Sequence, residues 1–180
     1  MPVSDDLAFN LLRAFAQLEF HLKQDAGFLK AGPHQMAQVN WQAVEAALTQ
    51  LQQAEFVERV ANTTRAKILA APRDLPMVQI VEVTEHSRRA TFTRLALDAT
   101  DAVALIEAAR RVRNNLFHGG KEEPHLGDDD EWAATALDVT ERLLRLIASN
   151  QPSLHKHDNK KDLAPGAGRH ASMHAPRAPP

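Results

Sequence analysis

Large apolar residues recur at steps of three and four positions in four separate stretches, and this period restricts the fold more than any other feature. Residues spaced in this way share one side of an α-helix, which has 3.6 residues per turn. The stretches span residues 7–24, 41–60, 101–118 and 129–149, and a short helix is expected at 63–70. Long amphipathic helices that follow one another in this way are typical of a helical bundle. The sequence therefore predicts an all-α bundle of four to five helices.

Residues that favour helix ends flank these stretches. Asp5 and Asp6 precede the first, where carboxylates interact favourably with the positive end of the helix dipole. Asn40 is a suitable N-cap for the second. The acidic run at 128–131 is interpreted as the start of the fourth helix rather than as a set of metal ligands. The glycine pair at 119–120 is expected to end the third, because glycine readily adopts the left-handed conformation that follows a helix.

Residues 73–97 give conflicting signals. Pro72 and Pro76 interrupt the backbone, and no second run is evident that would pair with a strand. We therefore expect an irregular segment with some helix between residues 78 and 96. The β-branched residues that would instead suit a short strand are Val78, Ile80, Val81 and Val83.

The end of the chain differs in composition from the rest. Residues 151–180 hold five of the ten prolines and almost no large apolar residues. Such a segment cannot offset the entropy of ordering by burial, so we expect a disordered tail after a helical domain at 1–150. The tail carries five lysines and arginines against two aspartates, which leaves residues 1–150 with a net charge of −5 in a chain of −2. Its four histidines are too loosely spread to preorganise a metal site.

The composition also argues against several classes of protein. The chain has no cysteine, so neither a disulfide framework nor a thiolate site is available. No apolar run approaches the roughly 20 residues that a membrane helix needs. The first ten residues carry two acids and no basic segment, unlike a secretion signal. We expect a cytoplasmic protein with no membrane partner, and its acidic body does not favour a long duplex footprint.

The densest group of polar side chains lies at residues 110–121, on the third helix and just beyond it. Helical spacing places Arg110, Asn114 and His118 on one row, and Arg113 can reach the same end. Arginine binds phosphate oxygens through paired donors, and a histidine near a helix C-terminus is suited to proton transfer near neutral pH. These groups suit phosphodiester chemistry in which the 2′-hydroxyl of RNA is the nucleophile. Neither a metal ion nor a cofactor is expected in such a reaction.

A family resemblance rests on the same residues. Residues 113–118, Arg-Asn-Asn-Leu-Phe-His, resemble the Arg-x-x-x-x-His motif of the HEPN superfamily, a nucleotide-binding helical domain of prokaryotes and higher eukaryotes. The wider string at 113–121 resembles the prokaryotic HEPN-like branch, and the resemblance covers residues 5–149. The residues that look like the opening helix of such proteins are Phe15, Leu18, Glu19, Phe20, Leu22, Lys23, Gly27 and Phe28.

The resemblance implies a helical bundle that forms a homodimer, with two motifs facing one another across a cleft. It implies a metal-independent endoribonuclease that leaves 2′,3′-cyclic phosphate and 5′-hydroxyl ends. In that role Arg113 would bind the scissile phosphate, His118 would act as general acid or base, and Asn114 would orient the substrate or the histidine. Many relatives act as toxins or in phage defence, often beside a nucleotidyltransferase-type antitoxin. Others are non-catalytic modules that bind a nucleotide, an RNA or a protein partner, and this remains the alternative.

The remaining polar residues have two interpretations each. Lys121 would touch the substrate phosphate or would be a solvated loop lysine. Glu19 would pair with an arginine or with His118 of the motif, although an ordinary pair with Lys23 is slightly favoured. Arg110 would guide RNA, or it would be a surface charge that pairs, like Arg111, with Glu107. Trp41 and Trp132 are expected to anchor the core rather than to stack on bases.

Overall fold

The computed structural model describes residues 3–51, 53–85, 87–117 and 129–154. The chain divides into two compact units, Met1–Asn150 and Gln151–Pro180. Of the second unit only residues 151–154 are described, as the last turn of a helix. The expected disorder is wrong for residues 151–154, which continue the helix that begins at Asp129. The rest of the predicted tail lies outside the described residues.

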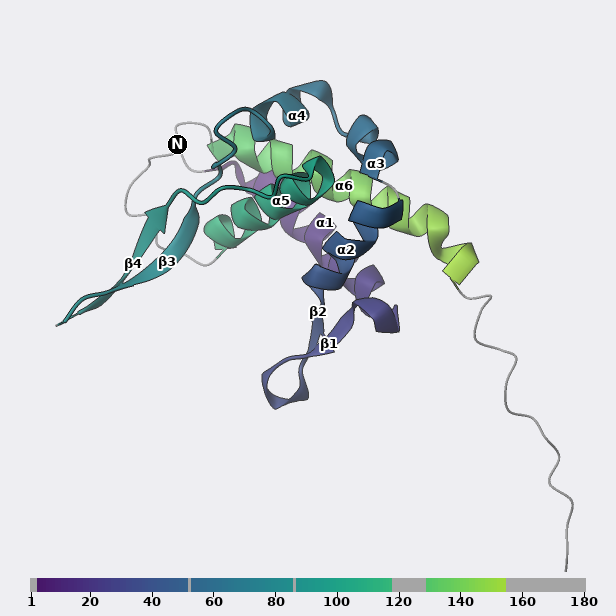
Figure 1. Ribbon diagram of the computed structural model, residues 1–180, viewed down its shortest axis with the longest axis horizontal. Coiled ribbons are helices and arrows are strands. Elements are labelled where there is room, and N and C mark those ends of the chain that lie inside the picture. The colour runs from purple at the N-terminus through teal and green to yellow at the C-terminus, as the bar shows by residue number, and fades with distance from the viewer. Residues whose placement is uncertain (1–2, 52, 86, 118–128, 155–180) are drawn as a thin grey trace, which may run out of the picture. The chain divides into compact units, whose positions relative to one another are not determined.

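The described residues of the chain are mostly helical, as the apolar period predicts (Figure 1). The described residues also form two small antiparallel strand pairs, β1–β2 and β3–β4, which an all-α fold does not contain. The helices are α1 (Asp5–Lys23), α2 (Trp41–Leu51), α3 (Gln53–Arg59), α4 (Asn62–Ile68), α5 (Asp101–Phe117) and α6 (Asp129–Leu154). The strands are β1 (Leu29–Ala31), β2 (Ala37–Val39), β3 (Val78–Val83) and β4 (Arg88–Thr93).

The predicted helix at 41–60 is two helices, α2 and α3, and the short helix expected at 63–70 is α4. The predicted end of α5 at the glycine pair 119–120 lies outside the described residues. The acidic run does begin α6, since the helix starts at Asp129. Its side chains also bind neighbouring elements, because Asp130 accepts a hydrogen bond from the backbone N–H of Ser4 at 2.8 Å.

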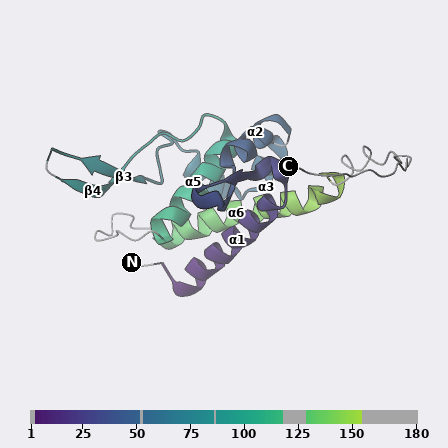
Figure 2. The same cartoon turned by 90° about the horizontal axis from the view of Figure 1, so that it is seen from below.

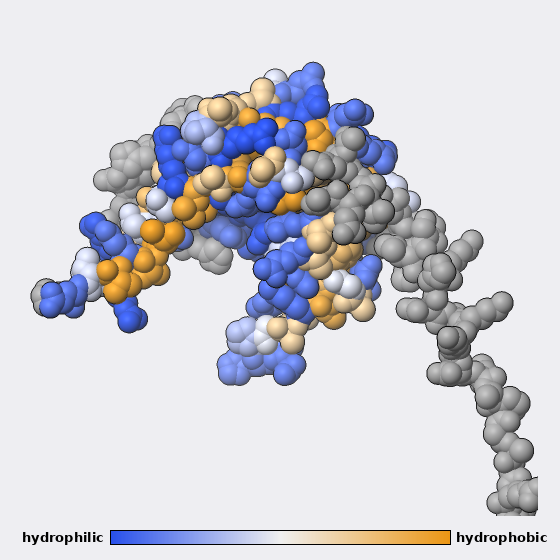
Figure 3. Space-filling view, viewed as in Figure 1, coloured by the Kyte–Doolittle hydropathy of each residue, from blue (hydrophilic) through white to orange (hydrophobic). Residues whose placement is uncertain are grey.

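The prediction of an irregular, partly helical segment at 73–97 is wrong. Residues 78–93 form a β-hairpin, in which Val78 pairs with Thr93 and Val83 pairs with Arg88. The β-branched run of β3 finds its partner in Arg88–Thr93, which carries threonines and a phenylalanine of its own. The hairpin bears exposed apolar side chains along its length (Figure 3), with Val81 and Val83 on one face.

The β1–β2 hairpin has strands of three residues each and was not predicted. Its register pairs Leu29 with Val39 and Ala31 with Ala37. The loop between the strands contains left-handed backbone at His34 and Gln35, with φ of 55° and 61°. A side chain at Gly32 would meet the end of the Gln38 side chain, which would have to move aside.

Helix α5 is the central element of the first unit, and it contacts α1, α2, α3, α4 and β3. Small residues on this helix let its neighbours approach closely, while the larger ones fill the space between them. In Figures 1 and 2, α1 and α6 run beside one another. The buried apolar residues of α5 are Ala102, Val103, Ala104, Leu105, Ile106, Ala108, Ala109 and Val112.

The core side of α1 packs against this centre through five buried residues, which are Leu11, Ala14, Phe15, Leu18 and Leu22. Burial of each large side chain contributes about 1.5–3 kcal/mol to folding. No helix among the described residues is both long enough and apolar enough to cross a bilayer. The packing of α1 against α5 fixes the place at which the polar motif of α5 meets other side chains.

Candidate functional site

Arg113 lies in the penultimate turn of α5 and faces α1. Its Nη2 lies 3.4 Å from Oε1 of Glu19, and its Nη1 donates to Oδ1 of Asn114 at 3.0 Å. The guanidinium carbon lies 5.9 Å from the centre of the Phe15 ring. The Nε atom is buried and has no hydrogen-bond partner among the described residues, although the side chain as a whole is 29% exposed. Arg113 therefore retains one donor that the fold does not satisfy.

Glu19 joins this arginine to the surface of α1. Its other carboxylate oxygen lies 3.9 Å from Nζ of Lys23, so both pairings considered for Glu19 occur together. The contact to Arg113 is longer than the 2.7–2.9 Å of a strong charge-assisted hydrogen bond. A better acceptor, such as a phosphate oxygen, would therefore have little hydrogen-bond energy to replace.

Arg110 lies one turn before Arg113 and faces α2. Its Nη1 forms an ion pair with Oε1 of Glu45 at 2.7 Å, and its guanidinium carbon lies 4.6 Å from the centre of the Trp41 ring. Burial lowers the pKa of Arg110, and burial raises the pKa of Glu45 from its usual value. For Arg110, desolvation outweighs the attraction of Glu45. For Glu45, the nearby carboxylates of Glu107 and Asp98 add to the effect of burial on the pKa.

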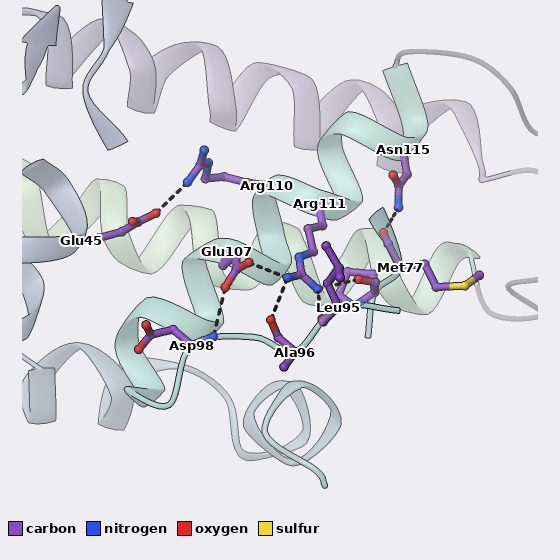
Figure 4. Close-up of polar contacts among 10 residues, drawn as sticks. Glu45, Met77, Leu95, Ala96, Asp98, Glu107, Arg110, Arg111 and Asn115 are labelled. Atoms are coloured by element: carbon purple, nitrogen blue, oxygen red, sulfur yellow. Dashed lines mark hydrogen bonds and ion pairs between the residues drawn. The ribbon is translucent and has the colours of Figure 1, made fainter. Parts of the chain in front are cut away.

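Arg111 has a structural role, and its predicted place on the surface is wrong. The side chain is only 7% exposed and donates to the carbonyls of Pro76, Leu95 and Ala96, at 3.2, 2.6 and 3.2 Å (Figure 4). It also pairs with Glu107 at 2.5 Å, as expected. Arg111 thus holds both ends of the segment that carries the β3–β4 hairpin.

A small cavity of about 130 Å³ connects these groups. It adjoins a larger hollow of about 550 Å³, with which it shares Trp41, Arg110 and Asn114. The larger volume lies in the range of small-molecule sites. The residues that line the small cavity are Phe15, Glu19, Trp41, Arg110, Arg113 and Asn114.

Four of the six predicted site residues therefore lie around one cavity: Arg113, Asn114, Arg110 and Glu19. The other two, His118 and Lys121, lie outside the described residues. The expected partner of Arg110 was Glu107, but the structure pairs it with Glu45.

Three residues at the site were not predicted from the sequence: Phe15, Trp41 and Glu45. Trp41 does pack against the core, as expected, and one face of it also meets Arg110. Trp41 and Glu45 are four residues apart and so share one face of α2. This spacing was the one feature of the sequence that could have predicted a contribution of α2 to the site.

The chemistry of the cavity follows from its lining. Two guanidinium groups and one amide supply donors, and their charge is balanced by Glu19 in the lining and by Glu45 in the adjoining hollow. Guanidinium groups of this kind bind phosphate or carboxylate oxygens in pairs. Among the described residues, no group of three or more histidine, aspartate, glutamate or cysteine side chains is placed to hold a metal ion.

No model of a known protein family matches the chain, and neither curated proteins nor solved structures give a match. What the fold and the site define is a mostly helical protein whose α1, α2 and α5 surround a polar cavity with two arginines.

Proposed function

We propose that the protein is a metal-independent endoribonuclease of HEPN type, with a HEPN-like bundle and a role as a toxin or in phage defence. The observation that carries the proposal is the convergence of Arg110, Arg113 and Asn114 on one cavity beside the end of α5. Arg113 and Asn114 belong to the Arg-x-x-x-x-His string at 113–118, and Arg110 lies three residues before it. A surface row of solvated charges would not line a cavity.

In this proposal Arg113 holds the scissile phosphate. Its Nη2 holds Glu19 only at 3.4 Å, so the Nη1 and Nη2 groups can both donate hydrogen bonds to phosphate oxygens. Such paired contacts stabilise the charge that develops as the 2′-oxygen attacks phosphorus. Asn114, which already contacts Arg113 Nη1, positions the guanidinium group or the substrate.

The proposed reaction is a transesterification within the RNA. The 2′-oxygen forms a bond to phosphorus as its proton is taken by a base, and the bond from phosphorus to the 5′-oxygen breaks. The leaving 5′-oxygen takes up a proton, and the products carry a 2′,3′-cyclic phosphate and a 5′-hydroxyl. His118 is proposed to transfer these protons. A second copy of the chain and a nucleotidyltransferase-type antitoxin are the proposed partners.

A non-catalytic binding module is the second candidate, and the charges of the cavity favour it. Glu19 and Glu45 already pair with Arg113 and Arg110, so an incoming phosphate must compete with a carboxylate at each arginine. Such a site would hold a nucleotide, an RNA or an acidic protein segment without cleaving it.

The test is the cleavage of a mixed RNA pool in EDTA by wild type, Arg113→Ala and His118→Ala. The control is Arg145→Ala, which removes a 62% exposed arginine of α6 away from the cavity. We expect wild type and the control to cleave alike and the two site variants to lose about 100-fold or more in rate. Binding of RNA without cleavage by the wild type would favour the second candidate. Equal cleavage by all four proteins would contradict both the site and the proposal.

A further inference from the structure

Helix α1 carries a second apolar stripe on the side opposite the core. Phe9, Leu12 and Phe20 are 63%, 41% and 61% exposed, and Ala16 lies exposed between them. Steps of three, four and four residues place these four side chains on one line along the helix. A surface helix ordinarily has one apolar side, so α1 is apolar in two directions.

The stripe is larger than the scattered apolar residues of an ordinary surface. With roughly 200 Å² for a full phenylalanine, the exposed fractions amount to about 300 Å² of contiguous apolar area. The largest apolar patch on a typical soluble monomer measures about 300–600 Å² and is often functional, and the stripe is of this size. In Figure 2, α1 runs along the outer side of the helices, beside α6.

The charges of α1 indicate what covers the stripe. Asp5 and Asp6 lie in its first turn and Lys23 in its last turn. The stripe is centred between Leu12 and Ala16, so an antiparallel copy of the helix would place Phe9 opposite Phe20. The same register brings Asp5 and Asp6 beside Lys23 of the second copy, at both ends of the pair. A parallel arrangement would instead put like charges together.

We propose that the stripe Phe9, Leu12, Ala16 and Phe20 is the surface on which a second copy of this chain docks, with the two α1 helices antiparallel. Ala16 near the centre lets the helix backbones approach closely, while the phenylalanines pack at both ends. The pair is isologous, because each copy contributes the same patch.

This arrangement has a consequence for the cavity. Glu19 lies beside the stripe, on the same side of it as Lys23. The two-fold axis that relates two antiparallel helices is perpendicular to the plane that contains them, so equivalent residues of the two copies lie on the same side of that plane. The two Glu19–Arg113 pairs would then lie on one side of the helix pair, about 14 Å apart along its axis at 1.5 Å per residue. The evidence for the docking surface comes from α1 alone. Only the effect of dimerisation on RNA cleavage rests on the proposed function.

The area sets the expected strength of association. About 300 Å² of apolar surface on each copy is below the roughly 450 Å² of apolar area per partner in a standard stable interface. We therefore expect a dissociation constant in the micromolar range, on the order of 1–100 µM.

Sedimentation velocity of the full chain over about 1–300 µM, without RNA, tests the surface because this range spans the expected constant. Phe9→Ser with Phe20→Ser should weaken association about 10-fold or more, with the helical circular dichroism unchanged. Val81→Ser with Val83→Ser is the matched control, since these side chains are 65% and 64% exposed on the β3–β4 hairpin. The control should associate like wild type.

Charge exchange tests the antiparallel register. Lys23→Glu should weaken association, and addition of Asp5→Lys and Asp6→Lys to the same chain should restore it. A wild type that stays monomeric throughout the range, or an association that the phenylalanine substitutions leave unchanged, would overturn the proposal. If the Phe9→Ser, Phe20→Ser variant still dimerised but no longer bound lipid vesicles that the wild type binds, the stripe would be a membrane-binding surface. That result would also overturn the proposal. A chain that dimerises in this way but does not cleave RNA refutes only the proposed function.

Discussion

Three arginines close together on α5 have different roles because they face different neighbours. Arg110 and Arg113 border the cavity, each with one carboxylate and one aromatic ring. Arg111, between them in sequence, is buried and satisfies three backbone carbonyls. Composition and local spacing could predict a cluster of positive charge here, but they could not tell which arginine is structural.

Glu45 gives the site a defined pH dependence. Burial raises its pKa above 4.5, so the folded state favours the neutral carboxyl more than the unfolded state does. Its contribution to stability is therefore fully present below pH 4.5 and is lost as the pH rises through the higher, folded-state pKa. We expect the free energy of unfolding of wild type, relative to Glu45→Gln, to fall as the pH rises through this window. Urea unfolding of both proteins at a series of pH values measures the difference, and a difference that rises with pH would contradict the assignment.

At the scale of the elements, the helices were predictable and the hairpins were not. The period of three and four residues placed α1, α5 and α6 within a few residues of their observed starts. Helix α1 has one buried side, whereas α5, with five consecutive buried residues from Ala102 to Ile106, is buried on most sides. The β3–β4 hairpin depends on pairing between two segments, neither of which is distinctive alone. The three-residue strands of β1–β2 are too short to leave a period in the sequence.

The site residues that could be predicted are those that local helix geometry brings together. Arg110 and Asn114 share a row of α5, and Arg113 lies beside it, so helix geometry alone brings them near one another. The contributions of Trp41 and Glu45 required the packing of α2 against α5, which is a tertiary contact. His118 and Lys121 lie beyond the described end of α5, and their roles stay predictions.

Arg111 links α5 to the segment that carries the β3–β4 hairpin, and a substitution of Arg111 tests this link. Arg111→Met would leave the carbonyls of Pro76, Leu95 and Ala96 without a donor and Glu107 without its pair. We expect a loss of about 3 kcal/mol in the free energy of unfolding, measured in urea. Arg145→Ala, on the exposed side of α6, should change it by less than about 0.5 kcal/mol. A similar small change for Arg111→Met would show that the hairpin segment is held by other contacts.

At the scale of the whole molecule, the two proposals concern opposite sides of one helix. The core side of α1 carries Phe15 and, at its border, Glu19, which face the cavity and Arg113. The outer side carries the stripe proposed to bind a second copy. A single helix would therefore contribute to both the site and the dimer, which is how two cavities come to lie on the same side of the pair.

The most direct test of the ribonuclease proposal is cleavage of one defined RNA beside the same RNA with a single 2′-deoxynucleotide at the cleaved position. The 2′-oxygen is the proposed nucleophile, so we predict that this bond alone becomes resistant in EDTA, while other sites still yield 2′,3′-cyclic phosphate ends. Cleavage at the deoxy position, or products with 5′-phosphate ends, would contradict the proposed chemistry.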